Sequence, residues 1–115
     1  MTPYKRGDVV LVAFPFTDLT TTKMRPAVVV SSEKFNRKFN DVVVVAITSQ
    51  IPKRISEEEF LLSPEDQKSA GLPKPSMVKL AKIVTLDQRL IRKNLGHISA
   101  STLSEITTVL HSILQ

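Results

Sequence analysis

Two runs of β-branched residues constrain what this chain can fold into. Val42–Ile47 is an almost unbroken series of valine and isoleucine, and Ala27–Ser31 is a second, shorter run. β-Branched side chains favour strands, and runs without polar alternation are typical of strands covered on both faces. We expect Val42–Ile47 to be a central strand and the two runs to pair antiparallel.

Polar side chains stand at matching ends of these runs. Arg25 lies just before the first run, and Thr48 and Ser49 directly follow the second. Antiparallel pairing would bring all three to one edge of the sheet. A permanent cation beside two hydroxyls suits an anionic ligand, a phosphodiester most of all. The alternatives are an arginine paired with a carboxylate such as Asp18, and hydroxyls that cap a loop.

The remaining segments predict more short strands around one clear helix. Leu103, Ile106 and Leu110 recur at spacings of three and four, and Ser99 or Thr102 would cap this helix. Further strands are expected at Val9–Phe14, at Ser76–Ile83, at Lys93–Ile98 with Gly96 as a bulge or close approach, and at Glu58–Leu62 as an edge strand. Glu33–Phe39 predicts one or two helical turns, and Ser63–Ala70 reads as a polar loop. Such a set favours one domain, residues 1–115, built as a small, strongly curved β-barrel.

The charge distribution favours a polyanionic partner. The net charge is +5, and residues 1–56 hold nine Lys and Arg against four Asp and Glu. Residues 57–115 hold seven of each, so the whole excess lies in the half with Arg25 and Thr48. A basic surface concentrates polyanions and makes binding salt-dependent. The simpler alternative is a soluble protein that happens to be basic.

Composition also narrows the chemistry. The chain has no cysteine, which excludes disulfides, cysteine zinc sites and thiol nucleophiles, and its two histidines are far apart. We therefore expect no metal and no cofactor. No secretory signal and no membrane-length apolar run are recognisable, so the expected location is the cytoplasm.

The ordered motifs resemble the MazF/PemK family of toxin–antitoxin endoribonucleases. The matching blocks are Arg6–Val10, Arg25–Ser31, Val42–Ser49, Gly71–Pro73 with Ser76–Val78, and Leu95–Ser99 leading into the helix. They cover nearly the whole chain. The resemblance implies an SH3-like β-barrel (MazF/PemK/CcdB-like) with a C-terminal helix, acting as a homodimer. It also implies metal-independent, sequence-selective cleavage of single-stranded RNA, a cognate antitoxin that blocks the RNA groove, and catalytic roles for Arg25 and Thr48.

Such cleavage uses the substrate's 2′-hydroxyl as nucleophile, and needs a base, donors for the phosphoryl oxygens and an acid for the leaving oxygen. Arg25 suits the phosphoryl oxygens but is a poor base. The acidic or histidine residues that some family members carry are missing here, which leaves Asp18 and Lys82 as base candidates. Expected RNA contacts are Ser49, Lys23, Thr17, Lys53, Arg54, Ser76 and Lys82.

Two other functions are compatible with the same barrel. One is a module that binds RNA or antitoxin with weak or no cleavage, which the missing base residues favour. The other is a gyrase-directed toxin, which the resemblance disfavours because those relatives rely on a tryptophan near the C-terminus and this chain has none.

Overall fold

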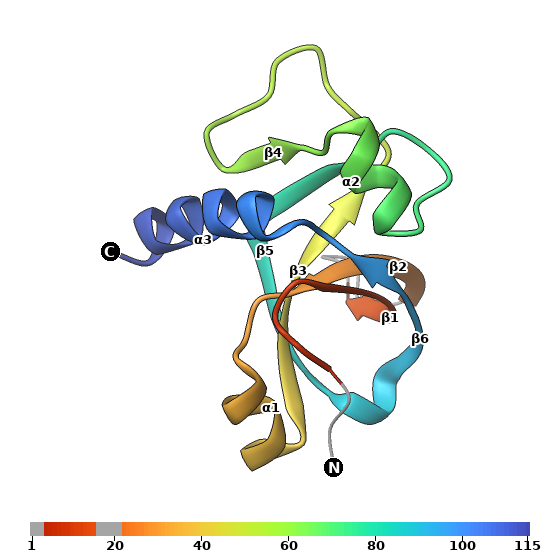
Figure 1. Ribbon diagram of the computed structural model, residues 1–115, viewed down its shortest axis with the longest axis vertical. Coiled ribbons are helices and arrows are strands. Elements are labelled where there is room, and N and C mark those ends of the chain that lie inside the picture. The colour runs from red at the N-terminus through yellow and green to blue at the C-terminus, as the bar shows by residue number, and fades with distance from the viewer. Residues whose placement is uncertain (1–3, 16–21) are drawn as a thin grey trace.

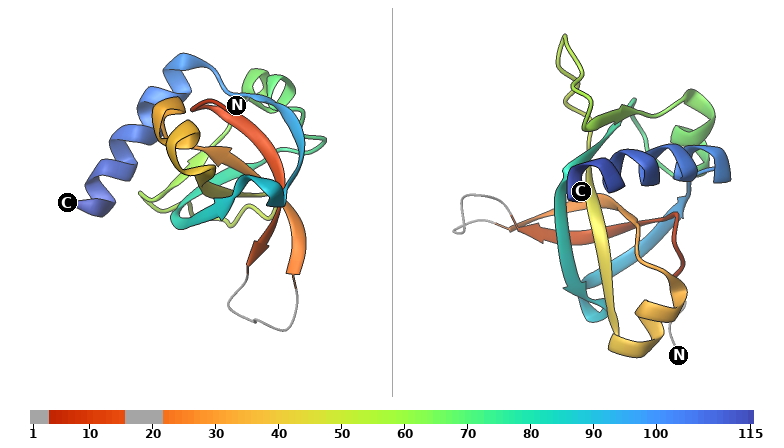
Figure 2. Two further views of the ribbon diagram at one scale, coloured as in Figure 1. Left: turned by 90° about the horizontal axis from the view of Figure 1, so that it is seen from below. Right: turned by 90° about the vertical axis from the view of Figure 1, so that its left-hand side faces the viewer.

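Six antiparallel strands and three α-helices make up the part of the chain that the structure describes, residues 4–15 and 22–115 of a computed structural model (Figure 1). The elements are β1 (Asp8–Pro15), β2 (Thr22–Val29), α1 (Glu33–Phe39), β3 (Asp41–Thr48), β4 (Glu59–Leu61), α2 (Pro64–Ser69), β5 (Met77–Asp87), a 3-10 turn η1 (Gln88–Leu90), β6 (Ile91–His97) and α3 (Ala100–Leu114). The strand order is β4-β5-β3-β2-β1-β6. Figure 2 shows how strongly this sheet curls, which gives the barrel-like, mainly β fold expected from the sequence.

The predicted pairing of the two β-branched runs is confirmed. β2 and β3 are antiparallel, with Val28 opposite Val45, and β3 lies between β2 and β5 as a central strand. Successive residues of the runs are buried on opposite faces. Val28 and Val45 pack in one core with Ile106 of α3, whereas Val29 and Val44 pack in a second core with Val12 of β1. Both faces are covered, which explains why the runs lack polar alternation.

Some boundaries differ from the sequence prediction. β2 begins at Thr22 rather than at Ala27, so Pro26 lies inside a strand. The ladder to β3 starts only at Ala27, and the missing N–H of Pro26 therefore costs no bond to that strand. The prediction of a loop at Ser63–Ala70 is wrong, because Pro64–Ser69 forms α2 with Ser63 as its N-cap and Pro64 in its first turn.

Asp66 of α2 joins this helix to the start of α3. Ser99 is the N-cap of α3, and its backbone N–H donates to Asp66 Oδ1 at 2.8 Å. The Thr102 hydroxyl donates to the other carboxylate oxygen. Asp66 thus takes the place of the acidic residue that a capping box would carry within the helix itself. Burial alone raises the pKa of Asp66, but hydrogen bonds from Thr102, Ser99 and Ser63 outweigh it and hold the pKa below its ordinary 3.8.

Two glycines allow the chain between α2 and β5 to lie directly against β6. A Cβ on Gly71 would stand 2.2 Å from the carbonyl oxygen of Leu95, and one on Gly96 would stand 2.1 Å from that of Ser69. The predicted special role of Gly96 is confirmed, since the β1–β6 register also shifts beside it. These approaches set the position of the segment that follows α2.

Replacing Asp66 by alanine is expected to lower the free energy of unfolding by about 2 kcal/mol, because hydrogen bonds to a buried charge are lost. This contribution is present above the unfolded-state pKa of about 3.9 and disappears as the pH falls through the lower folded-state pKa. Denaturant titrations from neutral to strongly acidic pH should show the two proteins converging in stability. Glu33→Ala, which breaks an exposed 2.7 Å ion pair with Arg37, should change little; an equal loss there would contradict the assignment.

Replacing Gly71 by alanine tests the close approach to β6. Gly7 is the matched control, because it also has a positive φ (+96°) but its nearest atom to an added Cβ lies at 3.4 Å. Gly7→Ala should cost about 1–2 kcal/mol from backbone strain. Gly71→Ala should cost about 2 kcal/mol more, since the backbone of Leu95 must move. Thermal melts that rank the two variants equally would show that the approach is unimportant.

Candidate functional site

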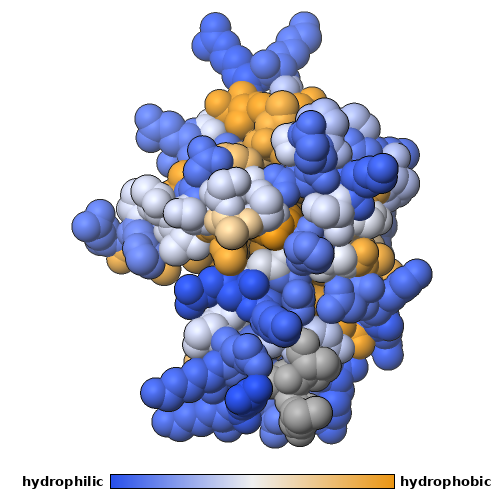
Figure 3. Space-filling view, viewed as in Figure 1, coloured by the Kyte–Doolittle hydropathy of each residue, from blue (hydrophilic) through white to orange (hydrophobic). Residues whose placement is uncertain are grey.

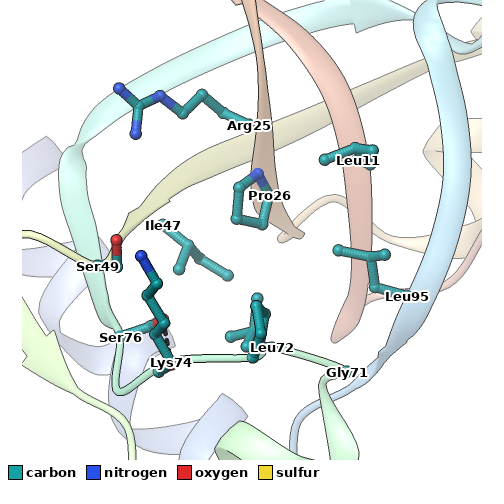
Figure 4. A pocket seen from close by; sticks show the side chains of 11 residues that line it. Leu11, Arg25, Pro26, Ile47, Ser49, Gly71, Leu72, Lys74, Ser76 and Leu95 are labelled. Atoms are coloured by element: carbon teal, nitrogen blue, oxygen red, sulfur yellow. Dashed lines mark hydrogen bonds between the residues drawn. The ribbon is translucent and has the colours of Figure 1, made fainter.

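A groove of about 360 Å³ opens where β1, β2 and β3 approach β6 and the segment after α2 (Figure 4). It is lined by Leu11, Arg25, Pro26, Ile47, Ser49, Gly71, Leu72, Pro73, Lys74, Ser76 and Leu95. The residues come from five separate stretches of sequence, and only the curl of the sheet brings them together. The β-branched run Ala27–Ser31 starts next to this groove, and the run Val42–Ile47 ends at it.

The floor of the groove is apolar. Leu11 and Pro26 are directly paired across β1 and β2, so their side chains share one face of the sheet. Ile47, Leu72 and Leu95 complete the floor, and Figure 4 shows their side chains turned toward the same space. Such a surface suits a flat, uncharged group.

The polar groups gather at one side of this floor. Figure 4 shows the Arg25 guanidinium, the Ser49 hydroxyl and the Lys74 ammonium on the same side, away from Leu11 and Leu95. Among the described residues, no acidic side chain lines the groove. The field in the groove is therefore positive, and it complements an anionic group placed beside an apolar one.

Arg25 and Thr48 lie just beyond one end of the β2–β3 ladder. That ladder ends at the pair Ala27 and Ala46, so each of the two residues stands two positions past its last pair. Arg25 is partly buried and lines the groove. Thr48 is also partly buried but is not among the residues that line the groove, and its Oγ1 accepts a hydrogen bond from the Gln50 N–H at 3.1 Å. That bond leaves the Thr48 hydroxyl proton available to a ligand.

The other predicted RNA contacts divide into two groups. Ser49 and Ser76 line the groove, but Ser76 is buried and its hydroxyl donates to the Lys74 carbonyl at 2.8 Å. Exposed positions outside the groove lining are Lys23 on β2, Lys53 and Arg54 in the loop before β4, and Lys82 on β5. Thr17 and Asp18 lie outside the described residues.

Lys82 lies in an irregular part of β5. Val45 pairs with Ile83 while Ala46 pairs with Lys79, so the residues between Lys79 and Ile83 have no partners on β3. This insertion interrupts the ladder to β3 within the predicted strand Ser76–Ile83. Lys82 is exposed there and does not line the groove, so its side chain would have to reach toward a bound substrate to act as a base.

Sequence reasoning missed Lys74 and the leucines of the floor. Leu11, Leu72 and Leu95 read as ordinary core residues because nothing in the sequence shows that they meet at an opening. Lys74 could have been singled out from the sequence, because it lies between Pro73 and Pro75 and these prolines stiffen the backbone that carries its charge.

Other parts of the described surface differ from the groove. Figure 3 shows hydrophobic colour near the loop before β4, where Ile51, Ile55 and Leu61 are exposed. No group of three or more metal-ligating side chains occurs among the described residues. None of the helices that the structure describes combines the length and apolarity that a membrane crossing requires.

Comparisons with known proteins give one consistent result. The family of PemK-like, MazF-like toxins of type II toxin–antitoxin systems matches residues 5–114. An endoribonuclease from mycobacterial species superposes with a TM-score of 0.77 at 27% identity, over 99% of this chain and 93% of that one. A mycobacterial endoribonuclease in complex with its cognate antitoxin gives a TM-score of 0.75 at 25% identity, over 96% and 94%. MazF from Deinococcus radiodurans gives 0.76 at 23% identity, over 99% and 97%, and supports the fold.

Proposed function

Since this chain belongs to the PemK-like, MazF-like toxin family of type II toxin–antitoxin systems, we propose that it is an endoribonuclease that cleaves single-stranded RNA. The observation that carries the proposal is the groove, in which Arg25 stands beside an apolar floor with Ser49 and Lys74 on the same side. Thr48 directly precedes Ser49 in the chain. This combination suits a phosphodiester whose neighbouring base is not stacked in a helix.

The proposed reaction is an internal transfer at phosphorus. The substrate's 2′-oxygen forms a bond to phosphorus while the bond to the 5′-oxygen breaks, which leaves a 2′,3′-cyclic phosphate and a 5′-hydroxyl. The Arg25 guanidinium donates two hydrogen bonds to the phosphoryl oxygens as negative charge grows on them. The Thr48 hydroxyl donates to the same phosphate. No metal ion is needed for these steps.

A base must take the 2′ proton, and an acid must protonate the 5′-oxygen. Arg25 hydrogen-bonds the leaving oxygen but cannot serve as the base. We assign the base to Asp18 or Lys82. Separate Asp18→Asn and Lys82→Gln variants distinguish them, because only loss of the true base removes the rise of the cleavage rate as the pH passes through the pKa of that base.

The apolar floor gives a reason for the single-strand preference. An unstacked base can lie over Leu11, Leu72 and Leu95, whereas a base inside a duplex cannot reach them. Ser49 at the polar side, with Lys23, Lys53 and Arg54 on nearby exposed strands and loops, would contact the backbone on either side.

The proposal includes the biological setting of the family. The chain would act in the cytoplasm as the toxin of a toxin–antitoxin pair and inhibit growth by cleaving messenger RNA. A homodimer and a cognate antitoxin are its proposed partners, supported by the related endoribonuclease whose structure contains its antitoxin. The antitoxin would act by covering the groove.

Incubation with long, mixed-sequence single-stranded RNA in excess chelator tests this function. Cleavage should leave 5′-hydroxyl ends, and 2′-O-methyl RNA of the same sequence should resist. Arg25→Ala should slow cleavage by about 10²–10³-fold, because it removes charge stabilisation at the phosphate. Thr48→Val should slow it by about tenfold, the value of one hydrogen bond to a charged group.

Arg37→Ala is the matched control. Arg37 is exposed on α1 and pairs with Glu33 at 2.7 Å, so its loss should leave cleavage unchanged. Cleavage that requires added metal, or that survives in Arg25→Ala, would contradict the mechanism. Binding without any turnover would select the alternative of a weakly catalytic RNA- or antitoxin-binding barrel, which the lack of an acidic side chain in the described groove lining favours.

A further inference from the structure

Lys74 occupies an unusual stretch of backbone beside Arg25. It stands between Pro73 and Pro75, whose rings fix φ and reduce the freedom of the segment. The segment starts at Gly71, which packs against the Leu95 backbone, and ends where β5 begins. The loop that carries Lys74 is therefore stiff at both ends and held against β6.

Hydrogen bonds of Ser76 hold this loop in place. It is only 4% exposed, and its hydroxyl donates to the Lys74 carbonyl at 2.8 Å. The Ser76 carbonyl in turn accepts from the Leu62 N–H at 3.0 Å, which ties the loop to the end of β4. These two hydrogen bonds hold the backbone on the C-terminal side of Lys74 in place.

The Lys74 side chain extends from this support into the groove. Figure 4 shows its ammonium on the same side of the groove as the Ser49 hydroxyl and the Arg25 guanidinium. Among the described residues, no carboxylate forms an ion pair with Lys74. A lysine that only kept the surface soluble would need neither the rigid loop nor this direction.

We propose that Lys74 is the second phosphate-binding cation of the groove and that Ser76 is a positioning residue which acts through it. The inference rests on the proposed function and names two residues of the same site. Arg25 grips the phosphate that is cleaved, and the Lys74 ammonium contacts the same phosphate or its neighbour as a point charge. Because the backbone of Lys74 is already fixed, less conformational entropy is lost when RNA binds.

Binding is measured first, with a mixed-sequence 2′-O-methyl RNA that can bind but cannot be cleaved through its 2′-oxygen. Lys74→Ala should weaken binding about tenfold, which corresponds to one hydrogen bond to a charged group. It should also reduce the slope of log affinity against log salt by about one. Lys74→Arg should retain most of the affinity. Lys68→Ala removes an exposed charge of α2 outside the groove and should change neither quantity.

A double-mutant cycle tests the role of Ser76. Ser76→Ala should weaken binding by part of the Lys74→Ala effect, and in the Lys74→Ala background it should have no further effect. Thermal melts of all variants are compared in parallel. A Ser76→Ala effect that is equally large without Lys74 would mean that Ser76 supports the fold alone, and it would overturn the positioning role.

The outcomes separate this inference from the proposed function. If the wild type binds or cleaves RNA and Lys74→Ala matches it in affinity and salt slope, the inference is wrong and the function stands. If the wild type binds without cleaving ordinary RNA, the endoribonuclease proposal fails and the binding measurements still decide the role of Lys74. If the wild type does not bind single-stranded RNA, both are wrong.

Discussion

The register between β2 and β3 determines the rest of the molecule. With Val28 opposite Val45, alternate residues of both strands supply the two cores, and a slip by one residue would exchange every side chain between them. The same register decides what happens at the strand ends. Arg25 and Thr48 both lie just beyond its last pair, and Pro26 and Ile47 line the groove. Core and site therefore both depend on this alignment.

A second set of contacts forms the opposite wall of the groove. Gly71 and Gly96 allow backbone to meet backbone, and Asp66 bonds the start of α3 to α2. The glycine contacts and the Asp66 hydrogen bonds differ in physical character. The glycines act by sterics and are insensitive to pH, whereas Asp66 acts through charge and loses its effect when protonated. Together they hold α2 and the segment with Leu72 and Lys74 against β6 and the start of α3, which forms this wall of the groove.

The sequence predicted those parts of the structure that depend on local patterns. β-Branched runs and the apolar spacing of the C-terminal helix gave the correct elements, and the antiparallel pairing followed from two adjacent runs. Of the two caps that the sequence offered for this helix, Ser99 and Thr102, the structure has Ser99. α2 was missed because its six residues are too few for an apolar stripe, although Ser63 and Pro64 form an ordinary helix start. The start of β2 was predicted at Ala27 rather than at Thr22, because the sequence cannot show where one ladder ends while another continues. The leucines of the groove floor were missed for a different reason, since their role depends on residues far away in the sequence.

The asymmetry of the groove bears on what kind of catalyst it can be. Its cations and hydroxyls lie on one side and its leucines on the other, so a bound dinucleotide has one natural orientation, with the phosphate toward Arg25 and a base over the floor. Positive charge concentrated there stabilises a transition state with growing negative charge, and it also favours ionisation of the 2′-hydroxyl beside it. A site of this kind depends less on a strong base than on accurate placement of the phosphate. That explains how a groove whose described lining holds no acidic side chain can still support cleavage, and why rigid backbone on both walls is the feature that the fold provides.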